Sequence, residues 1–190
     1  DTTQWQDSDL VFDYDRPLPK YYEYEYILGN LLPTIRYYVS VTAFDFGFAE
    51  GNIPSKESNK LNNITEAFAQ TSSDTVEEKQ LDAYIYPNPY RLDAAYAARG
   101  FENREGNLAP ERARRIHFAN LPKVCTISIY SLDGDRIDSW EHNFPDGGPE
   151  SMHDEWDVIT RNGLEPVSGL YYWVVESKDR TQIGKLVIIK

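Results

Sequence analysis

Apolar and polar positions alternate along the last third of the chain, a pattern typical of strands with one buried face. The segment Gly169–Glu176 is aromatic and β-branched, and Ile183–Ile189 is a second apolar run. The polar stretch between them, Lys178–Thr181, is short enough for a hairpin turn. We therefore expect a closing hairpin that ties the end of this sequence into a sheet.

Shorter strands with the same alternation precede this hairpin from residue 83 onward. Pro87-Asn88-Pro89 should end the first of them, because proline lacks a backbone donor and restricts the residue before it. Asp133-Gly134 predicts a tight turn between two others, and Asn162-Gly163 predicts a further turn. The expected strands are Ala83–Tyr86, Arg115–Phe118, Val124–Tyr130, Asp135–Trp140 and one that Glu155-Trp156-Asp157 opens.

Between the first two of these strands lies an insertion, Arg91–Pro110. Its alanine-rich part, Asp93–Arg99, is followed by Gly100 and predicts one or two turns of helix with Asp93 near the N-cap. The single cysteine shares an apolar face with Ile127 and Ile129, so we expect Cys125 to be a small buried hydrophobic residue.

The first sixty residues predict a second group of strands. Leu10–Phe12 is a short candidate that Arg16–Pro19 should interrupt. Tyr21–Leu28 alternates tyrosine and glutamate, and Tyr37–Ala43 places Tyr37, Val39, Val41 and Ala43 on one face. Residues 63–82 are polar and weakly periodic, which favours a linker, although Ile64–Phe68 is apolar enough to finish the preceding module. We expect modules at 1–62 and 83–190, joined by that linker.

The composition favours an all-β fold and excludes some partners. Aromatic residues are plentiful, helical periodicity is sparse, the net charge is −12 and the isoelectric point is about 4.6. Such acidity argues against nucleic acid and anionic membranes as partners, since both require a basic surface. The single cysteine excludes an intrachain disulfide, and no apolar run is long enough to span a membrane.

The chemistry-bearing residues do not predict an enzyme or a bound cofactor. We expect no metal site around His153, because alternation should send His153 and its neighbours Asp154, Glu155 and Asp157 to different faces. Asp133 and Asp135 are weak calcium candidates that lack the ligand spacing of a calcium loop. The tryptophans Trp5, Trp140 and Trp173 would suit sugar stacking if exposed, but we favour a structural role for them.

Leu31, Pro33 and Tyr37 have the spacing L-x-P-x-x-x-Y, followed by V-x-V-x-A. This resembles the tyrosine corner of a fibronectin type III domain, in which a tyrosine hydroxyl bonds back to the preceding corner. The resemblance covers about Tyr21–Asn62. A whole domain of this type needs about 100 residues, so we expect an incomplete module. Its missing strands would come from upstream in the same polypeptide or from a neighbouring chain.

Residues 84–190 carry a longer series of motifs in order. They are Y-P-N-P-Y, R-I-x-F-x-N-L-P, C-T-I-x-I-Y-S-L-D-G-D, E-W-D-x-x-x-R-N-G, S-G-L-Y-Y-W-V-V and I-G-K-L-V-I-I-K. The series resembles the Ig-like domain of flagellar hook-capping proteins and, equally, the C-terminal sorting domain of proteins exported by type IX secretion. The residues that carry this resemblance are Pro87, Asn88, Pro89, Trp156, Asp157, Gly169, Tyr171, Gly184 and Lys185.

The two resemblances imply two antiparallel β-sandwich modules, the first incomplete and the second with a short helical insertion. They also imply a non-catalytic C-terminal region of a secreted or cell-surface bacterial protein, serving sorting, anchoring or assembly. Its partners would be proteins, either the export or surface-assembly machinery or a neighbouring chain. Two alternatives remain open: an adhesin-like module that binds carbohydrate or calcium, and an accessory subunit of an extracellular filament or complex that is completed by strand donation.

Overall fold

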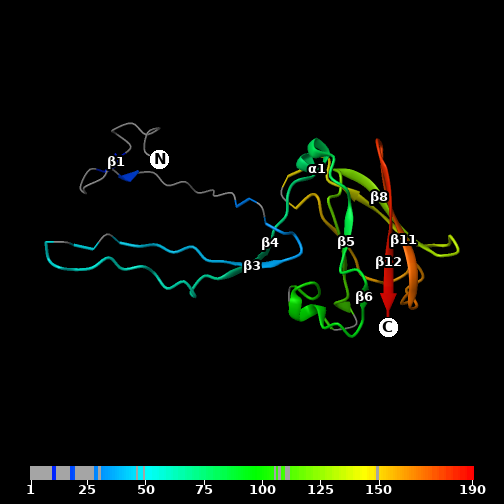
Figure 1. Cartoon of the computed structure of the whole chain (residues 1–190), viewed down its shortest axis with the longest axis horizontal. Coiled ribbons are helices and arrows are strands. Elements are labelled where there is room, and N and C mark those ends of the chain that lie inside the picture. Colours follow the sequence, from blue (N-terminus) through cyan, green and yellow to red (C-terminus); the bar gives the residue numbers. More distant parts are fainter. Residues whose placement is uncertain are drawn as a thin grey trace. The chain divides into compact units, whose positions relative to one another are not determined.

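The computed structural model describes residues 28–190, except residues 30, 46, 49, 105, 107, 110, 111 and 149, together with the backbone of two strands at 10–11 and 18–19. The chain divides into two units, Asp1–Leu31 and Leu32–Lys190, which we describe separately. Strands dominate the described residues, so the expectation of an all-β fold is confirmed (Figure 1).

In the first unit, β1 (Leu10–Val11) pairs antiparallel with β2 (Leu18–Pro19). β1 ends at Val11, before the stretch Arg16–Pro19 that we expected to interrupt it, but Leu18 and Pro19 of that stretch unexpectedly form the second strand of the pair. A proline is compatible with an edge strand because its missing N–H is not needed there. The expected strand at Tyr21–Leu28 lies outside the described residues except for Leu28.

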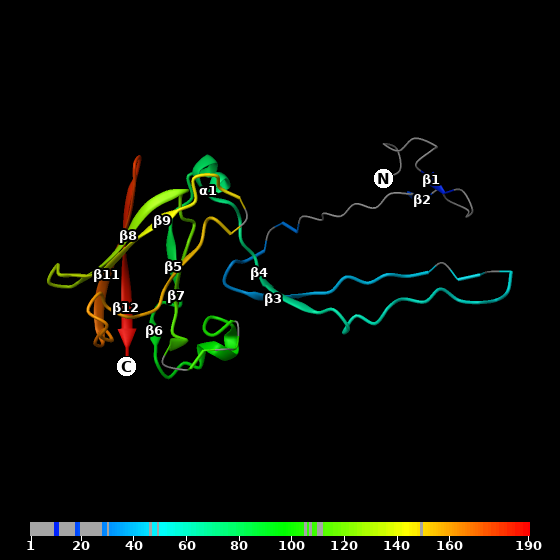
Figure 2. The ribbon, with the colours of Figure 1, turned by 180° about the vertical axis from the view of Figure 1, so that it is seen from behind.

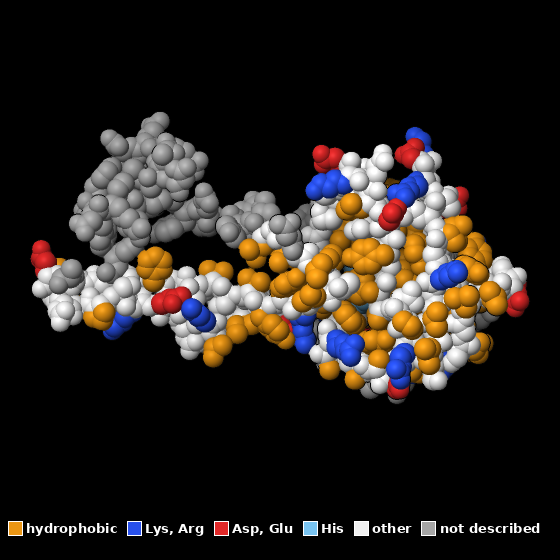
Figure 3. Space-filling model, in the orientation of Figure 1, with side chains coloured by type: hydrophobic (Ala, Val, Ile, Leu, Met, Phe, Trp, Pro, Cys, Tyr) orange, Lys and Arg blue, Asp and Glu red, His pale blue; other side chains and the backbone are white. Residues whose placement is uncertain are grey.

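The second unit begins with a two-stranded antiparallel ribbon made of β3 (Arg36–Val39) and β4 (Thr65–Phe68). The strand expected at Tyr37–Ala43 therefore starts one residue earlier and ends at Val39. Beyond it the described residues of the two branches form isolated bridges, Phe44↔Glu57 and Phe48↔Ile53, and scattered hydrogen bonds such as the one from the N–H of Ser58 to the carbonyl of Ala43. Apolar side chains are exposed along this ribbon and its extension, as the orange atoms of Figure 3 show; they include Val41, Phe44, Phe48, Ile53 and Leu61.

Residues 83–190 form two sheets that lie face to face (Figures 1 and 2). The three-stranded sheet has the order β10-β7-β5 and consists of β10 (Asp154–Trp156), β7 (Ile116–Ala119) and β5 (Tyr84–Tyr86). The five-stranded sheet has the order β6-β12-β11-β8-β9 and consists of β6 (Tyr90–Arg91), β12 (Thr181–Ile189), β11 (Gly169–Ser177), β8 (Val124–Ser131) and β9 (Arg136–Asn143).

One pairing in the five-stranded sheet corrects the expectation of a purely antiparallel sandwich. β6 runs parallel to β12, with Tyr90 opposite Ile188. The motif Pro87-Asn88-Pro89, in which both X–Pro peptide bonds are cis, separates β5 from β6. The chain leaves the three-stranded sheet at this motif and joins the edge of the other sheet in the same direction as β12.

The core lies between the two sheets. Phe118 from β7 is fully buried and contacts Trp140 and Trp173 of the opposite sheet edge-on, with ring centroids 5.6 and 6.3 Å apart. Such edge-to-face pairs add to the burial energy of the rings. Cys125, Ile127 and Ile129 face this core from one side of β8, as their alternation predicts.

The outer face of the three-stranded sheet is also covered, which explains why all four residues of β7 are buried. The helix α1 (Ser73–Lys79) packs Val76 near Tyr86, Ala119 and Met152. This helix lies within residues 63–82, where we expected an irregular linker. Its N-terminus is capped by Ser72, whose hydroxyl accepts from the N–H of Thr75, a signal readable from the sequence.

The insertion contains the expected helical turn in a tighter form. It is the 3₁₀-helix η2 (Tyr96–Arg99), which ends at Gly100 in the left-handed conformation. Asp93 lies two residues before the N-cap, Ala95, and does not cap the helix; both of its carboxylate oxygens accept from the Arg91 guanidinium instead. Phe101, just after η2, packs against Tyr86 and thus brings the insertion onto the outer face of the three-stranded sheet.

Candidate functional site

The closing hairpin, β11 and β12, is paired along its whole length, from Gly169↔Ile188 to Glu176↔Thr181. Its inner face supplies buried side chains to the core: Tyr171, Trp173, Val175, Leu186 and Ile188. β11 also pairs with β8 on its other side, so it lies in the interior of the five-stranded sheet. The closing hairpin is therefore part of the sandwich core.

Gly184 and Trp173 are directly opposite each other in this hairpin. A Cβ atom on Gly184 would overlap the indole ring of Trp173, which lies across the glycine. This arrangement explains the glycine in the middle of β12, because the large ring needs the space that a side chain would occupy.

The outer face of the closing hairpin is mostly apolar as well, although the exposed Glu176 lies at its turn end. Ile183 is 67% exposed, and the neighbouring outward residues are half-buried: Leu170, Tyr172, Val174 and Val187. Lys185, which is exposed and lies opposite Tyr172, is the one cation in this group. A strand pair in a one-sided sheet normally places polar residues outward, so this outer face is a candidate recognition surface.

The motif Pro87-Asn88-Pro89 is fastened to the closing hairpin through its asparagine. The Asn88 amide nitrogen donates to the backbone oxygen of Lys185 at 2.9 Å, and its Oδ1 accepts from the N–H of Val187 at 3.2 Å. The side chain of Asn88 thus forms hydrogen bonds with the β12 backbone as a neighbouring strand would. The strand β6 continues this pairing from Ile188 onward.

The other residues that carry the sorting-domain resemblance also hold backbone in place. The Trp156 indole is buried and donates to Asp138 Oδ2 and to the carbonyl of Ile159, at 3.0 and 2.9 Å. Asp157 Oδ1 accepts from the N–H of Ile159 at 3.0 Å. Tyr171 donates its hydroxyl proton to the carbonyl of Val167 at 2.7 Å. Their contacts are structural.

At the expected tyrosine corner, the N–H of Leu32 donates to the hydroxyl oxygen of Tyr37 at 2.9 Å. This is the backbone-to-tyrosine contact that the fibronectin resemblance implies. Leu31 and Pro33 flank the donor and are half-buried. The fibronectin-like identity of the first module itself stays a prediction.

A second group of polar residues lies on the outer face of the three-stranded sheet. His117 of β7 and Glu155 of β10 are directly paired across the two strands, so their side chains share one face. His153 precedes Glu155 by two positions and therefore points to the same side. We call these three residues the histidine cluster.

Our expectation that alternation separates these residues is wrong for His153 and Glu155, which are an even number of positions apart. It holds for Asp154, which points to the other side and accepts from His142 at 3.0 Å. His117, 36 positions upstream of His153, was recognisable only after the pairing of β7 with β10 was known.

The ligand-type atoms of the histidine cluster converge on one another. Nδ1 of His117 lies 3.0 Å from Nε2 of His153 and 3.1 Å from Oε1 of Glu155. The other nitrogen of His117, Nε2, donates to the carbonyl oxygen of Phe101 at 2.7 Å. The His117 ring is fully buried and stacks between Tyr86 and His153, with centroids 4.8 and 5.1 Å away.

The surroundings change the acidity of two members of the histidine cluster. Burial, and then the neighbouring charge of His117, lowers the pKa of His153 to about 4. Burial by itself would raise the pKa of Glu155, but the hydrogen bond and charge of His117 outweigh it and lower that pKa to about 2. His153 is therefore a neutral imidazole and Glu155 a carboxylate at neutral pH.

Phe101 and Arg104, both from the insertion Arg91–Pro110, pack against the histidine cluster. Phe101 supplies the carbonyl for His117, and Arg104 lies 3.9 Å from Glu155 Oε1 while its guanidinium stacks on the Phe68 ring. Arg115, at the start of β7, reaches Glu155 Oε2 at 3.3 Å. The basic residues of this region thus partly serve to hold one carboxylate in place.

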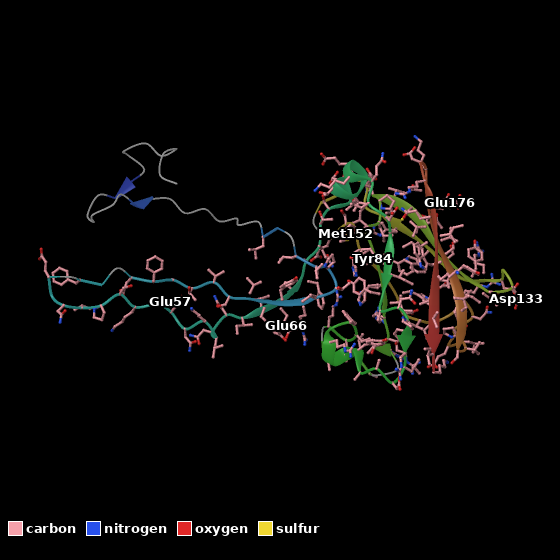
Figure 4. All side chains as sticks on the ribbon, in the orientation of Figure 1. Glu57, Glu66, Tyr84, Asp133, Met152 and Glu176 are labelled. Atoms are coloured by element: carbon pink, nitrogen blue, oxygen red, sulfur yellow. The ribbon has the colours of Figure 1, made fainter. Side chains whose placement is uncertain are left out.

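Other candidates from the sequence do not assemble into sites. Asp133 lies at the tip of the β8–β9 hairpin (Figure 4), and both Asp133 and Asp135 are exposed turn residues. Trp173 is only 7% exposed and Trp140 packs on Phe118, so neither offers a ring for sugar stacking; Trp5 lies outside the described residues. Cys125 is buried, and burial raises the pKa of its thiol to about 12, far from that of a reactive cysteine.

The sequence matches none of the protein-family models and none of the curated proteins searched. In the described part of the chain, no helix has the length and apolarity required to cross a bilayer.

Two solved structures from Porphyromonas gingivalis are similar to this chain. One is PorZ, described as an essential bacterial surface component of the type IX secretion system, with 17% identity, 57% of this chain and 11% of PorZ covered, and a TM-score of 0.39. The other is dimeric latent PorU, with 15% identity, 83% of this chain and 12% of PorU covered, and a TM-score of 0.35. The chain therefore matches only a small part of either protein, and a likeness of this degree carries no argument about function.

Proposed function

We propose that the chain is a non-catalytic C-terminal region of a secreted or cell-surface bacterial protein. In this proposal, export or surface-assembly machinery recognises and binds the sandwich of residues 83–190. The ordered motifs of residues 84–190, which resemble type IX sorting domains, support the proposed location outside the cell or on its surface. The apolar outer face of the closing hairpin is the observation that carries the proposal, because it supplies a surface for recognition.

The recognised surface in this proposal is the outer face around Ile183, Val174 and Tyr172, with Lys185 beside them. Apolar side chains on a sheet face supply binding energy when a partner covers them. A single cation within an apolar patch fixes orientation more than it adds affinity. The folded sandwich holds this surface rigidly, since the opposite faces of the same strands are in the core.

Point substitutions on the outer face test the proposal without removing the core. The Ile183→Lys variant of the chain, fused to a reporter and expressed in a bacterium that has type IX secretion, should lose most surface display. Lysine is well tolerated at so exposed a position, so the sandwich should still fold. Display is measured by surface labelling of the reporter on intact cells.

Leu164→Lys is the matched control, because Leu164 is 66% exposed and lies outside the closing hairpin. Its surface display should equal that of the unchanged chain. Circular dichroism of both purified variants verifies that each retains the fold. Normal display of a folded Ile183→Lys variant would refute the proposed recognition surface.

A further inference from the structure

We propose that His117, His153 and Glu155 form a binding site for one divalent transition-metal ion of borderline softness, with Zn²⁺ as the best fit. The site would fasten β7 to β10 on the outer face of the three-stranded sheet. This inference does not depend on the proposed function, because it rests only on the geometry of the histidine cluster.

The backbone places the three side chains together before any ion binds. His117 and Glu155 are a direct cross-strand pair, and His153 lies on the same face two positions before Glu155. Both strands are well packed, with His117 itself fully buried. A site built on paired strands is positioned more precisely than one built on loops.

The donor atoms have the chemistry of a zinc site, and two of their three separations are close to the spacing that zinc requires. Two imidazole nitrogens and one carboxylate oxygen are a known three-residue ligand set for Zn²⁺, which leaves a fourth position open. Ligand atoms around tetrahedral zinc are about 3.3 Å apart, given metal–ligand distances near 2.0–2.1 Å. The two separations from His117 Nδ1, 3.0 and 3.1 Å, are close to this spacing. All three donor atoms lie within 4.8 Å of one another, so His153 and Glu155 would turn slightly inward as the ion binds.

The second nitrogen of His117 supports the same assignment. Nε2 must carry a proton, because its partner at 2.7 Å is the carbonyl oxygen of Phe101, which only accepts. A metal-binding histidine typically donates its other N–H to a backbone carbonyl or carboxylate in this way. Nδ1 is then the atom that faces His153 and Glu155.

The lone pairs that meet in the cluster require a positive charge between them. Nδ1 of His117, Nε2 of His153 and Oε1 of Glu155 are all acceptor-type atoms when unprotonated, and they lie within 4.8 Å of one another. Either protons or a metal ion can supply that charge. Arg115 binds Oε2 and Arg104 stays 3.9 Å from Oε1, so a lone pair on Oε1 remains available to an ion.

Equilibrium dialysis of the purified full chain against Zn²⁺ tests the proposal, with an affinity tag that contains no histidine. We expect one Zn²⁺ per chain by elemental analysis and a higher midpoint of thermal unfolding with Zn²⁺ than without it. Neither Mg²⁺ nor Ca²⁺ should compete, because these ions prefer sets of oxygen ligands. Co²⁺ in the same site should give the visible absorption bands of a low-coordinate complex.

His153→Ala should weaken Zn²⁺ binding by at least tenfold and abolish the thermal shift; because His153 is partly exposed, this variant should fold. Glu155→Gln should weaken binding while keeping the shape of the side chain. His142→Gln is the matched control, because His142 is also buried between a carboxylate and a carbonyl but lies outside the cluster. Absence of stoichiometric Zn²⁺ in the unchanged chain, or equal binding by His153→Ala, would overturn the inference.

Discussion

Gly184 lies opposite Trp173 in the closing hairpin, at a point where the strand has no space for a side chain. Gly184→Ala should lower the free energy of unfolding by about 1–3 kcal/mol, the usual cost of overpacking a core. The added methyl group would force the buried indole out of its position against Phe118. Chemical denaturation of the two chains measures the difference.

Gly169→Ala is the appropriate comparison for this substitution. Gly169 is also a strand glycine of the closing hairpin, but a Cβ atom there would meet only the Tyr171 ring at an ordinary distance of 3.8 Å. Its stability should stay within about 0.5 kcal/mol of the unchanged chain, as for most surface substitutions. Equal destabilisation by both substitutions would show that the loss comes from general glycine flexibility and not from the Trp173 contact.

Single residues also show where sequence reasoning reaches its limit. The burial of Cys125 follows from its alternation with Ile127 and Ile129, a local pattern. The histidine cluster does not follow in the same way, because His117 and Glu155 meet only through the pairing of β7 with β10. Alternation within one strand predicts which residues share a face, but the register between strands distant in sequence remains undetermined.

At the scale of elements, the long strands and their turns were predictable. β8 and β11 agree closely with the expected segments because each has strong alternation and a clear turn signal. β9 ends three residues later than expected, and β12 begins two residues earlier. The parallel pairing of β6 was missed, since a two-residue strand has no periodicity to detect. α1 was missed because its helix has a single buried apolar residue, Val76, and only its serine cap marked its start.

The Pro87-Asn88-Pro89 element makes a prediction about the edge of β12. Asn88→Ala removes both side-chain hydrogen bonds to the backbone of Lys185 and Val187. Because Asn88 is exposed, water can replace part of what is lost, and we expect a decrease of about 1 kcal/mol in the free energy of unfolding. Amide hydrogen exchange at Val187 should become faster.

Asn143→Ala provides the comparison, since Asn143 is an exposed asparagine at the end of β9 on the opposite edge of the same sheet. That substitution should leave the exchange rate at Val187 unchanged. An unaltered exchange rate at Val187 in the Asn88→Ala variant would mean that the Asn88 hydrogen bonds do not stabilise β12. The proline motif would then only shape the turn between β5 and β6.

At the scale of the whole molecule, the closing hairpin cannot be removed without loss of the sandwich. β11 has hydrogen-bonded neighbours on both sides, and the hairpin supplies core residues from Tyr171 to Ile188. Each large apolar side chain lost from a core costs about 2–5 kcal/mol, whereas a domain is stable by only about 5–15 kcal/mol. We therefore expect a chain truncated after Ser168 to lose cooperative thermal unfolding and near-ultraviolet circular dichroism.

This expectation determines how export experiments on the chain are interpreted. A truncated chain that fails to reach the surface would fail for lack of a folded sandwich, whether or not the hairpin is recognised. The Ile183→Lys variant separates these causes, because it changes the recognition surface and leaves the core intact. If the truncated chain nevertheless unfolds cooperatively, with a midpoint near that of the unchanged chain, then β11 and β12 are dispensable for the fold. The hairpin would then be an appended element, and deletion would become a valid test of its role in sorting.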